Sequence, residues 1–495
     1  MRMLSLERTT LVICLALPGC RGDAGGAGPQ RPTREPLAEL PNIVFVLADD
    51  LGMGDLGCYN PDSKIPTPRL DAFANQARRF TDAHSPSGVC TPTRYGLLTG
   101  RYAWRTELQR SVLWGHSPLL IEPERPTIAK LCRSVGYATA CFGKWHLGLG
   151  DQQETDYEKP LRPGPLELGF DTFQGVPASP DMGPYVWIVD DRPASPATEN
   201  KELSMPRRGH DGGGFWRAGP SSPGFEHADL LPKTIDVAID WIGARATEPA
   251  PFFAYVALTA PHTPWMPSES FLGAAEAGPY GDFVAMVDAE LGRLFDELER
   301  LNLVDETLVI VTSDNGAHWE PGDIRTYDHR ANLHLRGQKG DAFEGGHRVP
   351  YLLRWPGRAA AGSVEDRLHS LTDTYATLAS LFGVPKAGAA PDSVDAAPLW
   401  LGEPSEPGAA GTRASMVQHS FEGMFALRSG RYKLIAGLGS GGFSSPVSIR
   451  PEPDGPIGQL FDLESDPSEQ HNLLLEQPEI VARIAEELRV IVETE

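Results

Sequence analysis

Several short runs of apolar residues along the chain end abruptly in polar residues. Residues 42–47, 252–258 and 307–311 are almost continuously apolar and rich in Val, Ile, Leu and Phe. Runs of this length and composition are typical of strands that are covered on both faces, as in parallel sheets. Residues 137–142 form a shorter run of the same kind. We expect these four segments to lie together in one sheet.

Helical patterns alternate with the expected strands. From Phe283 to Leu301, apolar residues recur every three or four positions, which indicates a helix with one buried face. Thr127 is a suitable N-cap for a helix that begins at Ile128. Helical spacing is also found over residues 70–80, 234–242, 374–381 and 480–491. The alternation predicts an α/β fold with a large mixed, mostly parallel sheet sandwiched by helices.

Changes in composition divide the chain further. Residues 150–225 are rich in Pro, Gly and charged residues, and we expect them to form long loops. A Gly-, Ala- and Pro-rich stretch near residues 386–411 indicates a linker or a surface loop. Beyond it come short strand candidates at 425–427, 432–435 and 460–463. We expect a main domain over residues 41–400 and a smaller C-terminal α+β domain over residues 401–495.

The start of the chain has the pattern of a secretory signal. A positively charged region precedes an apolar run over residues 9–17, which is too short to span a bilayer comfortably. The run ends in Leu17-Pro18-Gly19-Cys20, which is similar to a bacterial lipobox with Cys20 as the lipidated residue. We expect residues 1–20 to direct export across the bacterial inner membrane, and either a lipid anchor at Cys20 or release into the periplasm. Residues 21–40 predict a flexible linker.

The net charge excludes one class of partner. The chain has 44 Lys and Arg against 66 Asp and Glu, a net charge of −22. Because no basic surplus is present to neutralise phosphates, we do not expect nucleic acid as a partner. A pocket for sulfate or phosphate must instead concentrate positive charge locally, through a metal ion or clustered basic side chains.

The cysteines do not indicate a disulfide framework. Two of the six belong to the expected signal and Cys90 belongs to a motif described below. The odd number that remains leaves room for one bridge at most, among Cys58, Cys132 and Cys141.

Oxygen-bearing side chains follow two of the expected strands. Asp49 and Asp50 come after the strand at 42–47, and Asp314 and Asn315 come after the strand at 307–311. Ligands of α/β sheets bind beyond the carboxyl ends of the strands, so these residues are expected to meet there. Carboxylate and amide oxygens suit hard cations such as Ca²⁺ or Mg²⁺, although the same sequences are also ordinary turn formers.

Basic side chains follow the other two strands. Lys144 and His146 come after the strand at 137–142, and His262 comes after the strand at 252–258. Lys339 lies in a Gly-rich loop, ahead of Glu344-Gly345-Gly346. Each of these residues alone is more often a solvated loop residue, but their shared placement at strand ends favours an anion site.

One short motif carries chemistry of its own. Cys90-Thr91-Pro92-Thr93-Arg94 begins an expected helix, because proline is tolerated in a first helical turn. The positive end of a helix suits an anion, onto which Arg94 could fork from one turn further along. Together with the following Leu98-Thr99-Gly100-Arg101, this motif resembles the signature of the type I sulfatases.

Further segments match that family in the same order, from residue 42 to about residue 475. They are 42–50, 143–148, Pro261-His262, Ser313-Asp314-Asn315-Gly316, Lys339 with Glu344-Gly345-Gly346, and a closing segment with Leu460-Phe461-Asp462-Leu463, Asp466-Pro467 and His471-Asn472-Leu473. The resemblance implies an alkaline-phosphatase-like fold and a catalytic role for the main domain.

The resemblance also implies roles for individual residues. Cys90 would be oxidised to Cα-formylglycine by a formylglycine-generating enzyme, which is therefore an expected partner. Residue 90 would bind Ca²⁺ together with the four oxygen donors Asp49, Asp50, Asp314 and Asn315. The sulfate oxygens would be held by Arg94, Lys144, His146 and Lys339. His262 would lie with Lys339 at the leaving-group oxygen.

Hydrolysis of a sulfate ester follows from this arrangement. Hydrated formylglycine is a geminal diol, and one hydroxyl would attack sulfur with Asp314 as a candidate base. His262 or Lys339 would protonate the departing alcohol, and the second hydroxyl would then expel sulfate and restore the aldehyde. The substrate would be an aryl sulfate or a sulfated carbohydrate. Candidates for the outer pocket are Trp265, His318, Trp319, His419 and the loop from Asp181 to Tyr185.

Two other functions remain open from the sequence. A phosphate or phosphonate ester hydrolase of the same superfamily would share the fold, and some phosphonate monoester hydrolases also use formylglycine. A non-catalytic glycan-binding lipoprotein is the second alternative, although the intact set of nucleophile, metal and anion residues argues against it.

Overall fold

The computed structural model describes residues 37, 39–205, 214–386, 388–404 and 411–494. The expected signal peptide over residues 1–20, with Cys20, lies outside the described residues, as does most of the expected linker over 21–40. Within the described part of the chain, no helix has the length and apolar character that crossing a membrane requires.

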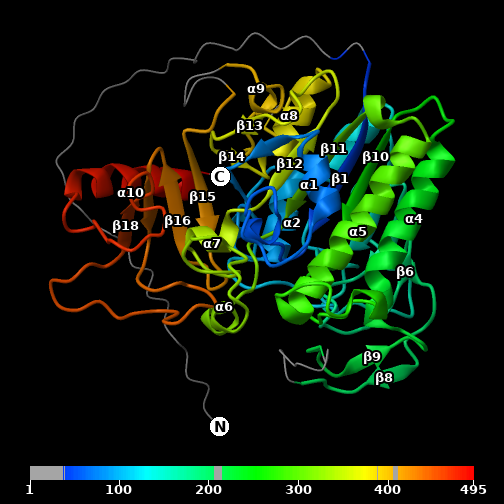
Figure 1. The fold of residues 1–495 in the computed structure, drawn as a ribbon, viewed down its shortest axis with the longest axis horizontal. Coiled ribbons are helices and arrows are strands. Elements are labelled where there is room, and N and C mark those ends of the chain that lie inside the picture. The colour runs from blue at the N-terminus through cyan, green and yellow to red at the C-terminus, as the bar shows by residue number, and fades with distance from the viewer. Residues whose placement is uncertain (1–36, 38, 206–213, 387, 405–410, 495) are drawn as a thin grey trace. The chain divides into compact units, whose positions relative to one another are not determined.

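A ten-stranded sheet forms the centre of the fold (Figure 1). Its strand order is β13-β2-β12-β11-β1-β10-β4-β5-β6-β7. The five strands β11, β1, β10, β4 and β5 are mutually parallel, whereas β12 and β6 run antiparallel to both of their neighbours. The central strands are β1 (Asn42–Ala48), β10 (Phe252–Ala257), β11 (Thr307–Ser313), β4 (Ala138–Lys144) and β5 (Thr172–Val176). The outer strands are β12 (Tyr351–Arg354), β2 (Arg78–Phe80), β13 (Val364–Glu365), β6 (Ile188–Val189) and β7 (Arg192–Pro193).

Helices cover both faces of this sheet, which confirms the predicted fold class. Side chains of β1 alternate between the two faces: Ile43, Phe45 and Leu47 belong to one apolar cluster, and Val44 and Val46 to the other. The first cluster joins α2 (Cys90–Thr99), α3 (Ile128–Ser134) and α8 (Asp373–Leu381) to the sheet. The second joins α1 (Pro68–Ala74), α4 (Leu230–Arg245) and α5 (Gly278–Arg300).

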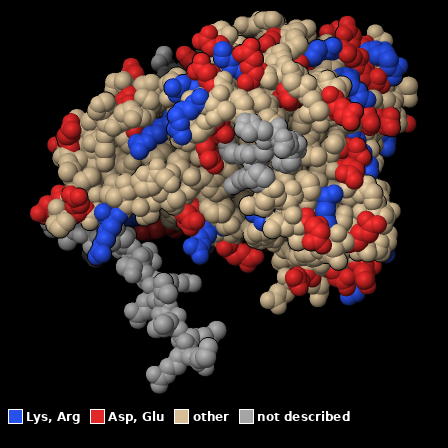
Figure 2. Space-filling model, turned by 60° about the horizontal axis from the view of Figure 1, so that its bottom comes forward, with Lys and Arg blue, Asp and Glu red and all other residues tan. Residues whose placement is uncertain are grey.

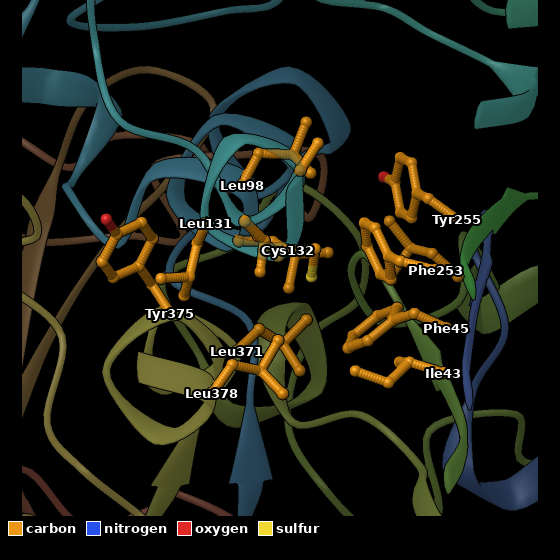
Figure 3. Close-up of a cluster of buried hydrophobic side chains, with 14 of the residues drawn as sticks. Ile43, Phe45, Leu98, Leu131, Cys132, Phe253, Tyr255, Leu371, Tyr375 and Leu378 are labelled. Carbon is orange, nitrogen blue, oxygen red and sulfur yellow. The ribbon is translucent and has the colours of Figure 1, made fainter. Parts of the chain in front are cut away.

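Figure 3 shows the first of these clusters from within. Phe45 and Ile43 from β1 and Phe253 and Tyr255 from β10 face Leu98, Leu131, Cys132, Leu371, Tyr375 and Leu378 across the core. Leu98 lies in α2, the helix that begins at Cys90. Burial of this apolar surface therefore fixes α2 against the parallel strands, and with it the position of residue 90.

A second, smaller sheet lies in the C-terminal part of the chain (Figure 1). It is antiparallel, in the order β15-β16-β17-β18, and packs on a C-terminal helix through Leu434, Leu460, Ile484 and Leu488. Its elements are β15 (Ser415–His419), β16 (Phe425–Ser429), β17 (Tyr432–Ile435), β18 (Gln459–Asp462) and α10 (Pro478–Glu493). The remaining short elements are β3 (Ala83–His84), β14 (His369–Ser370), β8 (Glu199–Lys201), β9 (Gly219–Ser221), α6 (Pro321–Tyr327), α7 (Glu344–His347) and α9 (Ala397–Trp400).

Two local predictions were wrong. The helical spacing over residues 70–80 continues past the real helix, which ends at Ala74, because Arg78–Phe80 leaves it to pair with β12. The expected long loops over 150–225 contain β5, a strand of the main sheet, because its short sequence Thr-Phe-Gln-Gly-Val has little apolar character of its own. In both segments, pairing with a neighbouring strand determines the secondary structure.

The cysteines inside the described residues are unpaired thiols. Cys58, Cys90, Cys132 and Cys141 are all free, so the one bridge that the sequence left open is not formed.

Candidate functional site

The predicted site residues gather at one edge of the sheet. Asp49 and Asp50 follow β1, Asp314 and Asn315 follow β11, and Lys144 is the last residue of β4. In the sheet, β1 lies between β11 and β10, and β4 pairs with the far side of β10. The carboxyl ends of these parallel strands therefore bring together side chains that are 95 to 265 residues apart in the sequence.

The acidic residues form a compact group of oxygens. One carboxylate oxygen each from Asp49, Asp50 and Asp314 lies within 4.8 Å of the other two. Asn315 donates a hydrogen bond to Asp50 Oδ1 at 2.7 Å, and the backbone N–H of Asp50 donates to Asp314 Oδ1 at 3.3 Å. All four side chains are buried. Three buried carboxylates so close together repel one another unless positive charge lies among them.

Two oxygens of this group have no hydrogen-bond partner among the described residues. They are Asp49 Oδ1 and Asn315 Oδ1, and both are buried. A buried oxygen without a partner is costly, and a hard cation would satisfy it by coordination. The donor set of carboxylate and amide oxygens therefore fits a Ca²⁺- or Mg²⁺-like ion.

Backbone geometry brings together the loops that carry these oxygens. Asp50 has a positive φ of 69°, a left-handed conformation that aspartate adopts more readily than most residues. Gly316, directly after Asn315, has no room for a side chain, because a Cβ there would lie 2.0 Å from the carbonyl oxygen of Gly345. Glycine at position 316 thus allows the loop after β11 to contact the segment that carries Lys339.

Three buried cations balance the three carboxylates. Arg94 donates from Nε and Nη2 to Asp314 Oδ2 at 3.1 and 2.8 Å, and from Nη1 to the carbonyl of Lys144 at 2.9 Å. Lys144 Nζ lies 2.6 Å from Asp49 Oδ2, and Lys339 Nζ lies 2.6 Å from Asp50 Oδ1. Burial acts to lower the pKa of Lys339, but the carboxylates of Asp50, Asp49 and Asp314 together with Cys90 outweigh it, so the net shift of the pKa is upward and the ammonium stays charged.

The charges inside the site are arranged differently from those on the face of the molecule shown in Figure 2. On the face shown in Figure 2, acidic and basic side chains are interspersed. In the site, two lysines and an arginine are buried beside three aspartates, and a divalent cation among the aspartates would leave a net positive charge. A chain with a net charge of −22 thus builds a pocket suited to an anion.

Cys90 is the first residue of α2 and lies next to the oxygen group. Its Sγ is within 4.8 Å of ligand atoms of both Asp49 and His262. The thiol is buried, and burial raises its pKa to about 11. Because a thiolate is the reactive form of cysteine, an unmodified Cys90 would be a poor nucleophile at neutral pH.

The two site histidines are neutral. Burial, followed by the charges of Lys144 and Arg94, lowers the pKa of His146 well below its usual value. Burial and Lys339 have the same effect on the pKa of His262. His146 Nε2 donates to the carbonyl of Leu113 at 2.8 Å, and His262 Nδ1 donates to the carbonyl of Thr263 at 2.6 Å. The free Nε2 of His262 lies 3.9 Å from Asp50 Oδ2.

The outer-pocket candidates have different surroundings. Trp265 and Trp319 pack with Tyr280 in an aromatic group behind Asp50, where the Tyr280 hydroxyl lies 3.3 Å from the Asp50 carbonyl. His419 is buried under the segment that leads to Cys90, and its carbonyl accepts from Gly88 N. His318 lies against Phe443, at 5.3 Å between ring centroids.

The loop from Asp181 to Tyr185 directly follows a segment that contacts His146. Ser179 Oγ, two residues before Asp181, is 3.5 Å from His146 Nδ1. The structure adds two residues that sequence reasoning missed, Trp114 and Arg217, which lie next to this loop. Both belong to segments without regular secondary structure, so no periodicity marks them.

Comparisons with known proteins agree with this geometry. The sequence model of the family described as Sulfatase matches residues 41–384. The chain is 33% identical over 488 residues to an N-acetylgalactosamine-6-O-sulfatase of Bacteroides thetaiotaomicron, covering 92% of this chain and 93% of that protein. It is 35% identical to human arylsulfatase A, covering 88% of this chain and 84% of that protein.

Solved structures show the same likeness in three dimensions. One described as "Metabolism of multiple glycosaminoglycans by Bacteroides thetaiotaomicron is orchestrated by a versatile core genetic locus" superimposes with a TM-score of 0.81 at 30% identity, covering 92% of this chain and 99% of that chain. A phosphonate monoester hydrolase of Agrobacterium radiobacter shares the fold at a TM-score of 0.58 and 19% identity, covering 91% of this chain and 95% of that chain.

Proposed function

This chain belongs to the sulfatase family and is a sulfuric ester hydrolase, and from that premise we propose that it uses a formylglycine at position 90 and a bound Ca²⁺ to desulfate a saccharide. The observation that carries the proposal is the pair of buried, unpartnered oxygens, Asp49 Oδ1 and Asn315 Oδ1, beside the first residue of α2. A cation would satisfy these oxygens by coordination. The raised pKa keeps the Cys90 thiol protonated, so a modified residue 90 would be the better nucleophile.

The chemistry of the site residues indicates which of them would serve the proposed cation and which the proposed formylglycine. Asp49, Asp50, Asp314 and Asn315 would hold the cation, which supplies charge to polarise a bound oxygen. Formylglycine would supply a hydrated aldehyde as nucleophile in place of the thiol. Conversion of Cys90 needs a formylglycine-generating enzyme as a maturation partner.

Arg94, Lys144 and Lys339 would hold the sulfate group. Each already contacts one of the aspartates, so a cation among those aspartates would weaken these ion pairs and free N–H groups for the sulfate oxygens. Charge that develops on sulfur's equatorial oxygens would then face fixed donors in a buried site. Because these three side chains are buried, such contacts would be stronger than they would be in solution.

His146 and His262 complete the pocket as neutral groups. Since His262 Nδ1 donates to Thr263, its Nε2 carries no proton and can accept a hydrogen bond at the leaving-group side. Lys339, which remains charged and lies at the same aspartate, is the donor there. Lys339 would therefore donate the proton to the departing oxygen, and the unprotonated Nε2 of His262 could accept a hydrogen bond only from the alcohol that has formed.

A saccharide ester is the substrate class that the relatives favour. The Bacteroides relative named above is an N-acetylgalactosamine-6-O-sulfatase and aligns over 92% of this chain. The human relative, an arylsulfatase, covers a smaller share of both chains. We therefore place a 6-O-sulfated hexosamine first and an aryl sulfate second.

Mass spectrometry of the peptide that contains residue 90 tests the proposed formylglycine. Trypsin should release residues 80–94, and the peptide should be about 18 Da lighter than the cysteine form, because oxidation to the aldehyde replaces sulfur by oxygen with loss of two hydrogens. Protein made without a formylglycine-generating enzyme should keep the unmodified mass. An unmodified thiol in fully active enzyme would overturn the proposal.

The cellular location is also a proposal. We propose that residues 1–20 direct export and that the mature enzyme begins at or near Cys20, which rests on the charged and apolar pattern of the start of the chain. The N-terminal mass of protein from the native cell envelope tests this, since lipidation at Cys20 adds acyl chains that simple cleavage does not.

A further inference from the structure

The region of the site beside His146 has its own set of side chains. His146 is held between the carbonyl of Leu113 and the hydroxyl of Ser179. Trp114 directly follows Leu113, and Asp181 lies two residues after Ser179. The two contacts of His146 thus bring the segments that carry Trp114 and Asp181 close together.

Arg217 connects these two residues. Its guanidinium forms an ion pair with Asp181 Oδ2, and its backbone N–H donates to the Asp181 carbonyl at 3.1 Å. The same guanidinium lies 5.0 Å from the ring centroid of Trp114 and 4.9 Å from that of Phe215. The three side chains therefore form one patch, which we name the Trp114 patch: Trp114, Asp181 and Arg217.

Asp181 carries an unsatisfied hydrogen-bond acceptor. Its side chain is only 6% exposed, and Oδ1 is buried without a hydrogen-bond partner among the described residues. Arg217 occupies the other oxygen. The charge of Asp181 also acts on His262, so the carboxylate lies near the leaving-group side of the sulfate pocket. A ligand that brings an O–H or N–H donor to this place would satisfy Oδ1.

Trp114 supplies an exposed apolar surface next to Arg217 and Asp181. It is 51% exposed, the most exposed tryptophan of the described chain. Arg217, with a side chain that is 38% exposed, holds the ring from one side by a cation–π contact. An exposed, fixed aromatic ring next to hydrogen-bonding groups is typical of a site that binds a ring with an apolar face and polar substituents.

We infer that the Trp114 patch is the subsite for the sugar that carries the sulfate ester. Asp181 Oδ1 accepts a hydrogen bond from a hydroxyl or an acetamido N–H of that sugar, and Trp114 packs against the apolar face of its pyranose ring. Arg217 fixes both side chains. This inference rests on the proposed saccharide substrate, and it makes Asp181 the residue that distinguishes a sugar sulfate from an aryl sulfate, which has no such donor.

The test compares two substrates on formylglycine-containing enzyme. The probes are 6-O-sulfo-N-acetylgalactosamine and 4-methylumbelliferyl sulfate. In Asp181→Asn the amide oxygen is expected to stay with Arg217, so that the NH₂ group faces the sugar and no acceptor remains. We expect kcat/KM for the sugar to fall about 30-fold, the effect of one hydrogen bond to a charged group. The value for the aryl sulfate should change less than about twofold.

A second variant does not depend on a buried charge. Trp114→Ala, at a half-exposed position, should raise KM for the sugar about tenfold with little change in kcat, because stacking contributes to binding of substrate and transition state alike. Trp114→Phe should restore most of this affinity. The matched control for Asp181→Asn is Asp462→Asn, since Asp462 forms a similar ion pair with Arg431 in the C-terminal part of the chain. Its kinetics on both substrates should be those of the wild type.

The outcomes separate the inference from the proposed function. Asp181→Asn with wild-type kinetics on the sugar would overturn the inference, as would equal losses on both substrates, which would show that Asp181 only supports the site structure. A wild-type enzyme that cleaves the aryl sulfate but not the sugar would overturn the proposed substrate and the inference with it.

Discussion

Arg94 donates two hydrogen bonds to one oxygen of Asp314, although the two residues are 220 positions apart. Arg94 lies in α2, one turn after Cys90, and Asp314 directly follows β11. The contact joins the helix that starts at Cys90 to the strand that supplies half of the oxygen donors. Because both side chains are fully buried, the pair fixes the proposed nucleophile and the proposed cation site in one geometry.

Replacement of this arginine tests its geometry. Arg94→Lys keeps the charge but cannot donate to Asp314 and to the Lys144 carbonyl at once. We expect kcat to fall by about 100-fold, the effect of losing one preorganised donor at a developing charge. Steady-state kinetics on an aryl sulfate would measure it. The control Arg431→Lys, in an ion pair of the C-terminal sheet, should keep wild-type kcat, and an Arg94→Lys variant that does the same would contradict the assigned role.

The nucleophile position has a matched control in the same core. Cys90→Ala should lose activity by about a thousandfold or more, because no nucleophile remains at the start of α2. Cys132→Ala removes another buried, free thiol, from α3, and should keep its activity. Sulfate release by both variants, together with their thermal unfolding, would be measured. Substantial activity in Cys90→Ala would place the reaction at a different site.

Lys339 is predicted to act on the reacting group. Lys339→Ala should reduce kcat by about 100-fold, since it removes a charged donor next to the leaving-group side. Lys64→Ala, which removes a partly exposed lysine paired with Glu276, serves as the control. Presteady-state release of the aryl alcohol would locate the defect in the first chemical step. A loss of less than tenfold in kcat would remove Lys339 from the mechanism.

Removal of the cation should affect stability as well as activity. Without it, Asp49, Asp50 and Asp314 keep only the nearby cations to balance their charge, so a chelator should lower the thermal unfolding midpoint. Elemental analysis should find a divalent metal in active protein, and Asp50→Asn should reduce its content. Re-addition of Ca²⁺ should restore both the midpoint and the activity. Active enzyme that contains no divalent metal would refute this prediction.

A buried charge network outside the site predicts sensitivity to acid. Burial favours a raised pKa for Asp82, but a hydrogen bond from His84 and the guanidinium groups of Arg348 and Arg428 outweigh it, and the net pKa is well below the ordinary value. A carboxylate with a lowered pKa stabilises the fold at every pH above its unfolded-state pKa of about 4. That stability is lost as the pH falls below this value.

Asp82→Asn should therefore destabilise the protein most at neutral pH. We expect a loss of about 3 kcal/mol in the free energy of unfolding at pH 7, because two partly buried arginines lose their shared partner. The difference from wild type should shrink as the pH approaches 3. Denaturant unfolding at several pH values would measure it, and a difference that does not change with pH would show that charge on Asp82 is not the cause.

The sequence accounts for much of the fold because the central strands carry their signal locally. The apolar runs over 42–47, 252–258 and 307–311 became β1, β10 and β11, and the stripe from Phe283 to Leu301 lies largely in α5. These segments are buried whatever their partners are, so their composition alone predicts them. By contrast, β5 and β2 are strands because their neighbours offer hydrogen bonds, and short, weakly apolar sequences give no sign of it.

For the candidate site too, some features follow from the sequence and others only from the tertiary structure. The sequence by itself determined which residue types follow which strands, and it identified the motif around Cys90, because local order and spacing are properties of the chain. Only the tertiary structure decided which lysine meets which aspartate, that Asp49 Oδ1 and Asn315 Oδ1 remain unpartnered, and that Trp114, Asp181 and Arg217 share one patch. Those relations depend on strand order and loop packing, which place distant segments within a few ångströms, and no local pattern encodes that distance.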